Sequence, residues 1–243
     1  MPDAPQLADL REEGRRLLAA ARERDVDVRL MGGVAVALRC PSAAHPPLAR
    51  DYKDIDLAAP SAARRPLSAL LTDLGYVADQ EFNALQGRTR LLFNAPDGRQ
   101  IDVILDELQM SHTLDLRKRL LLDEQTLTPP DLLLSKLQVV ELNERDLKDA
   151  AALLHDHDTG DERVVEVLAA DWGWWRTVTG NLEQLERWTG SLDGFRDGAA
   201  RIHERIRTLR RRIDQAPKSM RWKARAKVGE RVRWYELPEE VGG

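Results

Sequence analysis

The chain has 243 residues, of which 42% are hydrophobic and 32% are charged, and its formal net charge is −4. This composition is typical of a folded globular protein and excludes an intrinsically disordered chain. The sequence has no apolar run long enough for a membrane-spanning helix, and its first residues lack the apolar segment of a secretory signal peptide. We therefore expect a cytoplasmic protein with no membrane partner, built as one large domain or two small ones.

The first quarter of the chain alternates between helix and strand. Apolar residues at helical spacing predict a helix over 6–25, and "VRLM" predicts a strand over 28–31. Gly32 and Gly33 follow this strand, and a second helix is expected from there to Pro41. The single cysteine, Cys40, cannot form an internal disulfide, and its surroundings favour a buried apolar side chain over a nucleophile.

A proline-containing loop precedes the next elements. We expect a strand over 53–59, a helix capped by Ser61 that continues to about Leu74, and a β-hairpin around the turn "PDGR". The order of helices, strands and hairpin predicts an α/β (α+β) domain with a small mixed sheet over residues 1–127.

From residue 128 the pattern becomes helical and predicts a separate helical domain over 128–243, with breaks at "HDHDTGDE", "TGSLDG" and "QAPKS". The "HDHD" motif at 155–158 lacks the spacing that places two histidines on one helical face, so we interpret it as a solvated loop. All six tryptophans lie in this half. They could stack nucleobases, but clustered tryptophans near a helix favour packing in the core.

Two aspartates lie one residue apart in the apolar strand "DIDLAA". In a strand, Asp54 and Asp56 point to the same face, with Cα atoms about 6.6 Å apart. Asp102 lies in the second strand of the predicted hairpin, again between apolar residues. Three carboxylates on neighbouring strands can bind Mg²⁺ or Mn²⁺, which prefer oxygen ligands. The ordinary alternative is that each acid is solvated or paired with Lys53 or Arg99.

This combination resembles the nucleotidyltransferase superfamily of the DNA polymerase β type. The resemblance covers about 28–154 and consists of Gly-Gly, then "DIDL", then "IDV". It implies that Asp54, Asp56 and Asp102 are the catalytic, metal-binding residues and that Gly32 and Gly33 hold the triphosphate of an NTP such as ATP. The backbone N–H groups at a helix N-terminus suit such an anion.

The stretch "LLLSKLQVVELNERDLKDAAALL" is similar to the AbiEii-type branch, which includes toxin nucleotidyltransferases and lies close to antibiotic nucleotidyltransferases. On that resemblance Lys136, Asp146 and Asp149 would contribute to the nucleotide site, together with Arg145. Two alternatives stay open from the residues themselves. Lys136 could lie on an ordinary helix surface, and the two aspartates could pair with Lys148 or Arg145 within their own helix.

The charge is unevenly distributed. Between Arg201 and Tyr235 there are thirteen Lys or Arg and three Asp or Glu, a local charge of +10, so the remainder carries −14. A basic block on an acidic protein is typical of a surface that binds a polyanion, although a solvated helix face gives the same pattern.

We therefore expect a Mg²⁺-dependent transferase that moves a nucleoside monophosphate from an NTP to an acceptor and releases pyrophosphate. The basic block and the toxin resemblance favour RNA, such as tRNA, as the acceptor, and the toxin resemblance implies an antitoxin partner. The alternatives are a small hydroxylated acceptor, as in antibiotic-type enzymes, and a non-catalytic relative that binds nucleotide or RNA.

Overall fold

The computed structural model describes residues 9–158 and 162–236, which pack into two compact units. Of these residues, the first unit contains 9–38, 51–108 and 115–128, and the second contains 39–50, 109–114 and everything from 129 onward. The segments 39–50 and 109–114 fall in the part of the sequence assigned above to the first domain. In the structure they pack with the helical unit.

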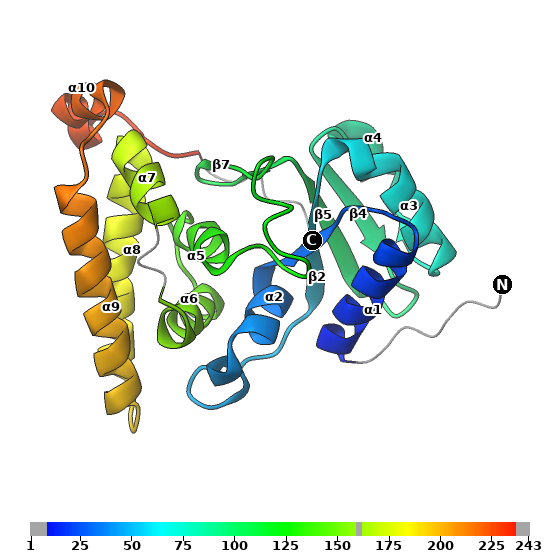
Figure 1. Cartoon of the computed structure of the whole chain (residues 1–243), viewed down its shortest axis with the longest axis horizontal. Coiled ribbons are helices and arrows are strands. Elements are labelled where there is room, and N and C mark those ends of the chain that lie inside the picture. Colours follow the sequence, from blue (N-terminus) through cyan, green and yellow to red (C-terminus); the bar gives the residue numbers. More distant parts are fainter. Residues whose placement is uncertain (1–8, 159–161, 237–243) are drawn as a thin grey trace. The chain divides into compact units, whose positions relative to one another are not determined.

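A five-stranded mixed sheet is the centre of the first unit (Figure 1). Its strands are β1 (Arg29–Met31), β2 (Asp54–Ala59), β3 (Val77–Ala78), β4 (Arg90–Asn94) and β5 (Gln100–Leu105), in the order β1-β2-β5-β4-β3. Only β2 and β5 are parallel neighbours among these strands, and the other pairs are antiparallel. The predicted mixed sheet is confirmed.

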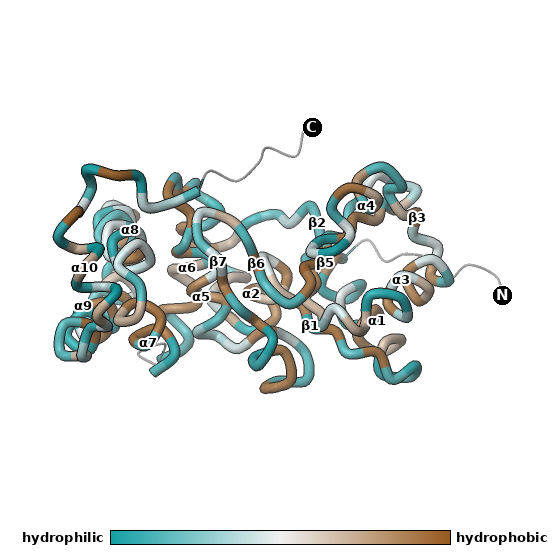
Figure 2. The backbone as a smooth tube through the Cα atoms, turned by 90° about the horizontal axis from the view of Figure 1, so that it is seen from above, coloured by the Kyte–Doolittle hydropathy of each residue, from teal (hydrophilic) through white to brown (hydrophobic). Residues whose placement is uncertain are grey.

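The predicted hairpin is also confirmed, as β4 and β5. Its turn is closed by a hydrogen bond from Ala95 N to Arg99 O of 2.7 Å, and Gly98 has a φ of +86°, which favours glycine. Ile101 and Val103 of β5 are buried, and Figure 2 shows much of this strand in the brown of apolar residues. The hairpin therefore supplies the central strand of the sheet.

The helices of the first unit are α1 (Leu10–Glu23), α2 (Gly32–Arg39), α3 (Arg64–Asp73) and α4 (Gln80–Gln86). The last residue of α2, Arg39, belongs to the second unit. Helix α1 packs on β1 and β2 with Leu17 and Ala21 buried, and α3 packs beside it (Figure 1). The predicted helix and strand over 6–31 are thus confirmed for the described residues from 9 onward.

One local prediction for this unit is wrong, and one helix was missed. Ser61 does not cap α3: it begins a short 3₁₀ segment (Ser61–Ala63), and its backbone N–H donates to the Asp106 carboxylate at 2.9 Å. Helix α4 was not predicted. None of its seven residues is buried, so it has no apolar periodicity, and its N-cap Asp79 is its local start signal.

The second unit contains the helices α5 (Pro129–Leu137), α6 (Glu144–Asp156), α7 (Glu162–Ala170), α8 (Trp172–Gly190), α9 (Arg196–Gln215) and α10 (Met220–Val228). Short 3₁₀ segments lie at Pro41–Ala44 and Gly229–Arg231, and β6 (Glu107–Gln109) pairs with β7 (Thr113–Asp115) in a separate two-stranded ribbon. The predicted helical character and the three predicted helix breaks are confirmed where the structure describes them. Among the described residues, no helix has both the length and the apolar character to cross a membrane.

Helix α9 shows why the basic block is compatible with a stable fold. Its buried residues recur every three or four positions, as in an amphipathic helix. They are Ala199, Ile202, Ile206, Leu209 and Ile213. Arg201, Arg207, Arg211 and Arg212 between them are exposed, so the solvated-face interpretation accounts for a share of the local +10. Arg205 and Arg210 instead bond to α6 and α8.

Candidate functional site

The parallel pairing of β2 with β5 brings the predicted acids together. Asp56 lies directly opposite Asp102 in the strand register, and Asp54 lies opposite Gln100. Residues aligned in this way point to the same face of the sheet. Asp54 is exposed, whereas Asp56 and Asp102 are half-buried. The structure therefore places all three predicted carboxylates on one face, at the end of the sheet that solvent reaches.

Gly32 is packed against Asp56. A Cβ atom at Gly32 would lie 1.7 Å from Asp56 Oδ2 and 2.6 Å from its Cγ, and the φ of Gly32 is +62°, in the region that favours glycine. Both observations require glycine at this position. The backbone at the start of α2 thus contacts the carboxylate directly, and Gly33 follows as a buried residue of the first helical turn.

Asp102 is paired with an arginine that the sequence analysis missed. Arg90 donates from Nε to both Asp102 oxygens at 2.8 and 3.0 Å and from Nη2 to Oδ2 at 2.5 Å. The bond to Asp102, and more weakly the charge of Asp56, raise the pKa of Arg90. The sequence analysis suggested Lys53 and Arg99 as partners of the acids. The suggestion of Arg99 was wrong, because Arg99 pairs with Asp97.

The hairpin register was the signal that could have identified Arg90. A turn centred on 97–98 pairs Leu92 with Asp102 and Arg90 with Ile104. Arg90 is then two residues along its strand from the position opposite Asp102, on the same face, and within reach of a long side chain.

Lys136, Asp146 and Asp149 form a second group, within the second unit. Lys136 Nζ lies 2.9 Å from Asp149 Oδ2 and 3.4 Å from Asp146 Oδ1, so α5 and α6 are joined by ion pairs. Arg50 completes the group with a bidentate contact to Asp149 at 2.6 and 2.8 Å. No local pattern predicts this role of Arg50, which lies 99 residues from Asp149 along the chain.

Both simple alternatives for this group were wrong. Lys136 is not on an ordinary helix surface, because its side chain is only 15% exposed. Lys148 pairs with Glu144, and the two aspartates bind Lys136 of the neighbouring helix. Burial works to raise the pKa of Asp149, but Lys136 and Arg50 outweigh it, and the pKa is lowered overall. A role for this group in nucleotide binding stays a prediction.

Two predictions about the 39–50 segment and its surroundings are settled by burial and contacts. Cys40 is fully buried, and this burial raises the pKa of its thiol to about 12, which confirms an unreactive side chain. The solvated-loop interpretation of "HDHD" was wrong for His155 and Asp156, which end α6. Asp156 accepts hydrogen bonds from the N–H and hydroxyl of Ser42 at 2.9 and 2.8 Å.

Among residues 9–158 and 162–236, no group of three or more His, Cys, Asp or Glu side chains is arranged to hold a metal ion. This finding agrees with the position of Asp102, whose oxygens face Arg90. Asp54 and Asp56 remain as the proposed metal ligands, and Asp102 can join them only when Arg90 moves away from its oxygens. Mg²⁺ is commonly bound by one or two carboxylates together with substrate phosphates, so the donor chemistry of this face fits a Mg²⁺–nucleotide complex.

Comparison with known proteins gives no family model and no curated protein that matches the chain. Several solved structures are similar to it, and two of them are described here. The lincomycin-bound lincosamide antibiotic adenylyltransferase LnuA is 13% identical, with 61% of this chain and 98% of that chain covered and a TM-score of 0.42. The antibiotic-resistance factor ANT(2'')-Ia is 17% identical, with 70% and 92% covered and a TM-score of 0.44. At these TM-scores the likeness does not establish a shared fold.

Proposed function

We propose that this chain is a Mg²⁺-dependent nucleotidyltransferase that transfers a nucleoside monophosphate from an NTP to an RNA acceptor. The observation that supports the proposal most directly is the contact of Gly32 with Asp56, in register with Asp102. Three parts of the predicted motif lie together here. They are Gly32, which only glycine can occupy, the Asp56 carboxylate that it contacts, and Asp102 opposite Asp56 on the neighbouring strand.

The reaction follows from these positions. An acceptor hydroxyl attacks the α-phosphorus of the NTP, the bond from that phosphorus to the pyrophosphate oxygen breaks, and pyrophosphate leaves. Bound Mg²⁺ would neutralise charge that develops on the phosphates. Asp54 and Asp56 hold the Mg²⁺–nucleotide complex, and the N–H groups at Gly32 and Gly33 bind phosphate oxygens.

Asp102 takes the proton of the acceptor hydroxyl as general base. Its pairing with Arg90 is compatible with this role, because an ionised carboxylate offers about four acceptor sites and Arg90 occupies three of them in this geometry.

The acceptor is proposed from the basic block between Arg201 and Tyr235. Lys and Arg that contact phosphates release counterions, so binding of RNA should weaken steeply as salt increases. Affinity that stays flat between low and moderate salt would contradict an RNA acceptor. The antitoxin partner and a toxic activity stay predictions of the AbiEii resemblance.

The test is transfer of label from NTPs radiolabelled at the α-phosphate, each in turn, with Mg²⁺ and total cellular RNA, resolved on a denaturing gel. We expect label in RNA with the wild type and none with Asp56→Asn, which should remain folded because one fewer carboxylate on this face reduces repulsion. Asp73→Asn is the matched control, since Asp73 is exposed and pairs with Arg24 away from the sheet face.

Other outcomes assign the chain differently. Pyrophosphate released only when a pool of small hydroxylated molecules is added would indicate an antibiotic-type acceptor. Nucleotide that raises the melting temperature, with no label transferred and no pyrophosphate released, would indicate a non-catalytic binding protein. Unimpaired transfer by Asp56→Asn would contradict the site itself.

A further inference from the structure

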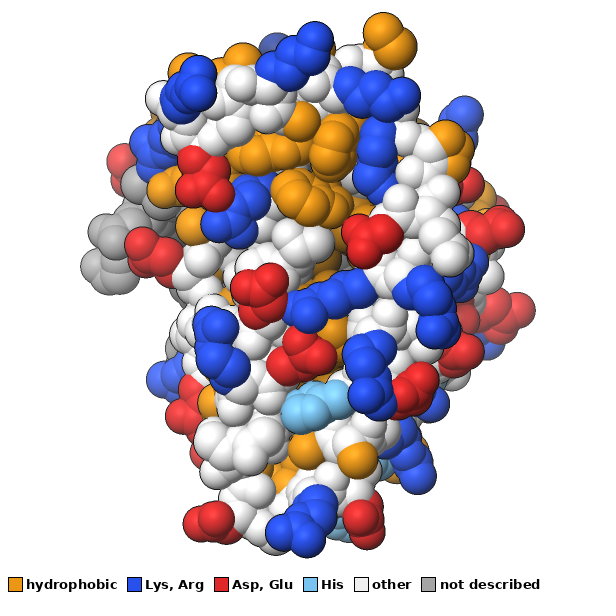
Figure 3. Space-filling model, turned by 90° about the vertical axis from the view of Figure 1, so that its left-hand side faces the viewer, with side chains coloured by type: hydrophobic (Ala, Val, Ile, Leu, Met, Phe, Trp, Pro, Cys, Tyr) orange, Lys and Arg blue, Asp and Glu red, His pale blue; other side chains and the backbone are white. Residues whose placement is uncertain are grey.

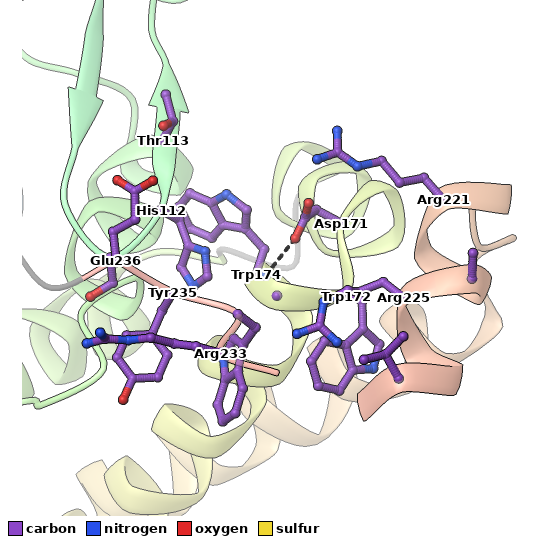
Figure 4. Close-up of a pocket in the computed structure, with 15 residues that line it drawn as sticks. His112, Thr113, Asp171, Trp172, Trp174, Arg221, Arg225, Arg233, Tyr235 and Glu236 are labelled. Carbon is purple, nitrogen blue, oxygen red and sulfur yellow. Dashed lines mark hydrogen bonds between the residues drawn. The ribbon is translucent and has the colours of Figure 1, made fainter. Parts of the chain in front are cut away.

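The second unit contains a cavity of about 760 Å³ with aromatic and basic walls. It is formed by the turn at 111–113, the first residues of α8, helix α10 and the segment 233–236 (Figure 4). Ligand sites in proteins typically measure roughly 300–1,000 Å³, so a group of the size of a nucleotide can enter it. The sheet face with the three carboxylates belongs to the first unit and does not contribute to it.

A row of aromatic rings leads from α10 to this cavity, and three of its members, Trp172, Trp234 and Tyr235, line the cavity wall. Ring centroids are separated by 5.4 Å between Trp222 and Trp175, 6.2 Å between Trp175 and Trp172, 5.8 Å between Trp172 and Trp234, and 5.3 Å between Trp234 and Tyr235. Trp172 is buried, whereas the other four are only partly covered. The prediction that the tryptophans pack in a core is therefore confirmed for Trp172 and Trp174 but incomplete for the partly covered rings.

The segment after α10 is fixed to the rest of the cavity wall. Trp234 Nε1 donates to the Thr177 hydroxyl at 3.1 Å, and Glu236 N donates to Ser111 O at 3.0 Å. Thr177 also contacts His112 Nε2 at 2.9 Å. These contacts hold the rings in place before any ligand arrives, and such preorganisation lowers the entropic cost of binding.

His112 extends the aromatic wall. It stacks on Trp174 with ring centroids 5.0 Å apart, as Figure 4 shows. Burial lowers the pKa of His112 to about 4, so its ring is neutral at neutral pH. The wall at this point is uncharged and flat, which suits the face of a base.

The cations of the cavity divide into two kinds. Arg225 is held over the Trp172 ring at 4.8 Å and donates to Gly229 O and Val232 O, so it supports the wall. Arg233 also lies over a ring, that of Tyr235, at 4.8 Å, but like Arg221 it is exposed, and no acidic residue within the described part of the chain forms an ion pair with either. Their guanidinium groups are available to an anion.

The acids of the cavity are Asp171 and Glu236. Asp171 is the N-cap of α8, where its carboxylate accepts from Trp174 N at 3.1 Å, the bond dashed in Figure 4. Asp171 therefore has a structural role at the start of α8, whereas Glu236 is exposed and is held to the wall by its backbone N–H, which donates to Ser111 O.

The surroundings of the cavity are basic as well. Helix α10 has no buried residue and presents Arg221, Lys223, Arg225 and Lys227. Figure 3 shows this face of the second unit, with exposed apolar side chains in a hollow and Lys and Arg side chains around it. A solvated helix face explains exposed arginines along α9, but it explains neither a cavity nor the partly covered rings within it.

We propose that this cavity binds single-stranded nucleic acid, with a base against the rings of Trp234 and Tyr235 and the flanking phosphates against Arg221 and Arg233. Aromatic rings stack on any base, and guanidinium groups pair with phosphate, so the two features together match an unpaired strand. The proposal names the place on this chain where the RNA acceptor of the proposed transferase is held, and in that respect it rests on the proposed function.

The test measures binding without transfer, in the absence of NTP and Mg²⁺. The probe is a fluorescent oligoadenylate RNA of about 12 nucleotides, followed by fluorescence anisotropy over a range of salt. We expect Arg221→Gln/Arg233→Gln to weaken binding by about tenfold and to reduce the salt slope by about 1.4, the value for two lost contacts with a single strand. The same RNA in a duplex should bind more weakly than the single strand, because its bases are covered.

Arg211→Gln/Arg212→Gln is the matched control. Both residues are exposed on α9, belong to the same basic block and lie outside the cavity. The control removes the same charge, so equal losses in both double variants would show general electrostatic attraction and overturn the proposal. We expect the control to weaken binding less than about threefold.

Trp234 tests the aromatic half of the proposal. Trp234→Leu should weaken binding by about tenfold, and Trp234→Phe, which keeps a stacking face, should restore most of it. Wild-type affinity in Trp234→Leu would overturn stacking. Free AMP that competes as well as unlabelled oligoadenylate would assign the cavity to a mononucleotide and overturn the nucleic-acid proposal.

The two proposals fail in different ways. RNA that binds in this cavity but receives no label would contradict the transferase and leave the cavity assignment intact. Label that enters RNA equally well in Arg221→Gln/Arg233→Gln and wild type, with unchanged RNA affinity, would contradict the cavity assignment alone.

Discussion

The two units contain acidic residues in opposite situations. In the helical unit Asp149 and Asp131 are buried, and each is paired with cations: Asp149 with Arg50 and Lys136, Asp131 with Arg163. On the sheet of the first unit, by contrast, carboxylates lie half-buried or exposed at the end of two parallel strands. Buried charges are tolerated only with partners, whereas solvent stabilises exposed ones. The acids of the helical unit are therefore tied to its stability. On the sheet, Asp102 is paired with Arg90, and Asp54 and Asp56 are the carboxylates that we propose for the nucleotide site.

The largest effect should come from Gly32→Ala. The new Cβ would overlap the Asp56 carboxylate, and alanine is strained at a φ of +62°. We expect nucleotidyl transfer to fall by about a thousandfold, as for loss of a catalytic carboxylate. Initial rates of pyrophosphate release measure the change.

Gly98→Ala is the control for backbone strain. Gly98 also has a positive φ, +86°, but nothing lies within 4 Å of the position of a Cβ. The substitution should cost roughly 1 kcal/mol of stability and leave turnover unchanged. If both variants lost activity alike, strain in the sheet rather than displacement of Asp56 would be the cause.

Asp149→Asn tests whether the buried acids of the helical unit stabilise it. It removes the carboxylate that Arg50 and Lys136 share, and the side chains of these two cations are only 12% and 15% exposed. Lys136 keeps its longer contact with Asp146. We expect the free energy of unfolding to fall by about 3–5 kcal/mol, as when one partner of a buried ion pair is removed. Urea unfolding followed by far-UV circular dichroism measures it.

Glu144→Gln is the matched control in the same helix. Glu144 is 69% exposed and forms an i,i+4 pair with Lys148. Exposed helical pairs contribute about 0.3–0.5 kcal/mol, so this variant should unfold almost as the wild type does. A similar small effect for Asp149→Asn would mean that the buried group does not stabilise the unit.

Sequence patterns predicted the elements of the sheet and the face of its acids because both depend on local rules. Alternation of apolar and polar residues identified β2 and β5, and the Asp-Gly turn identified the hairpin. That Asp56 lies opposite Asp102 depends on the parallel pairing of β2 with β5, which no local pattern specifies. The sequence analysis brought these two residues together by taking their strands as neighbours, and the family resemblance implied the same site.

Partners distant in the sequence were the main failures. Arg50 pairs with Asp149 across 99 residues, and Ser42 with Asp156 across 114. Such pairs arise from tertiary packing of the 39–50 segment, and neither periodicity nor charge spacing reports on it. The prediction that Ser61 caps α3 was wrong for the same reason, because Asp106 of another segment accepts a hydrogen bond from the Ser61 N–H.

The pH dependence of stability gives a smaller effect in the second unit. His112 has a pKa lowered to about 4 in the folded protein, against about 6.5 when unfolded. The unfolded chain therefore binds a proton first as pH falls, and stability is lost between about pH 6.5 and pH 4. Because His112 is only partly buried, we expect a total loss of about 1–3 kcal/mol and no contribution above this range.

Urea unfolding of the wild type and His112→Gln across this pH range isolates the contribution, because other titrating groups cancel in the difference. His45→Gln controls for the loss of an exposed histidine. If the free energy of unfolding depended on pH in the same way for wild type and His112→Gln, the lowered pKa of His112 would be contradicted.

Arg90→Gln should have the smallest effect on stability and tests how the sheet face is prepared for Mg²⁺. The Arg90 side chain is 37% exposed and that of Asp102 is 17% exposed, so after solvent screening the pair should contribute less than about 1 kcal/mol. Loss of the guanidinium removes a cation that competes for the Asp102 oxygens. We therefore expect half-maximal transfer at a Mg²⁺ concentration several times lower, roughly 3- to 10-fold, with stability nearly unchanged. Arg99→Gln is the control in the same hairpin, since Arg99 pairs with Asp97 of the turn. An unchanged Mg²⁺ requirement in Arg90→Gln would mean that Asp102 does not contact the metal, and its role would then be limited to accepting the proton.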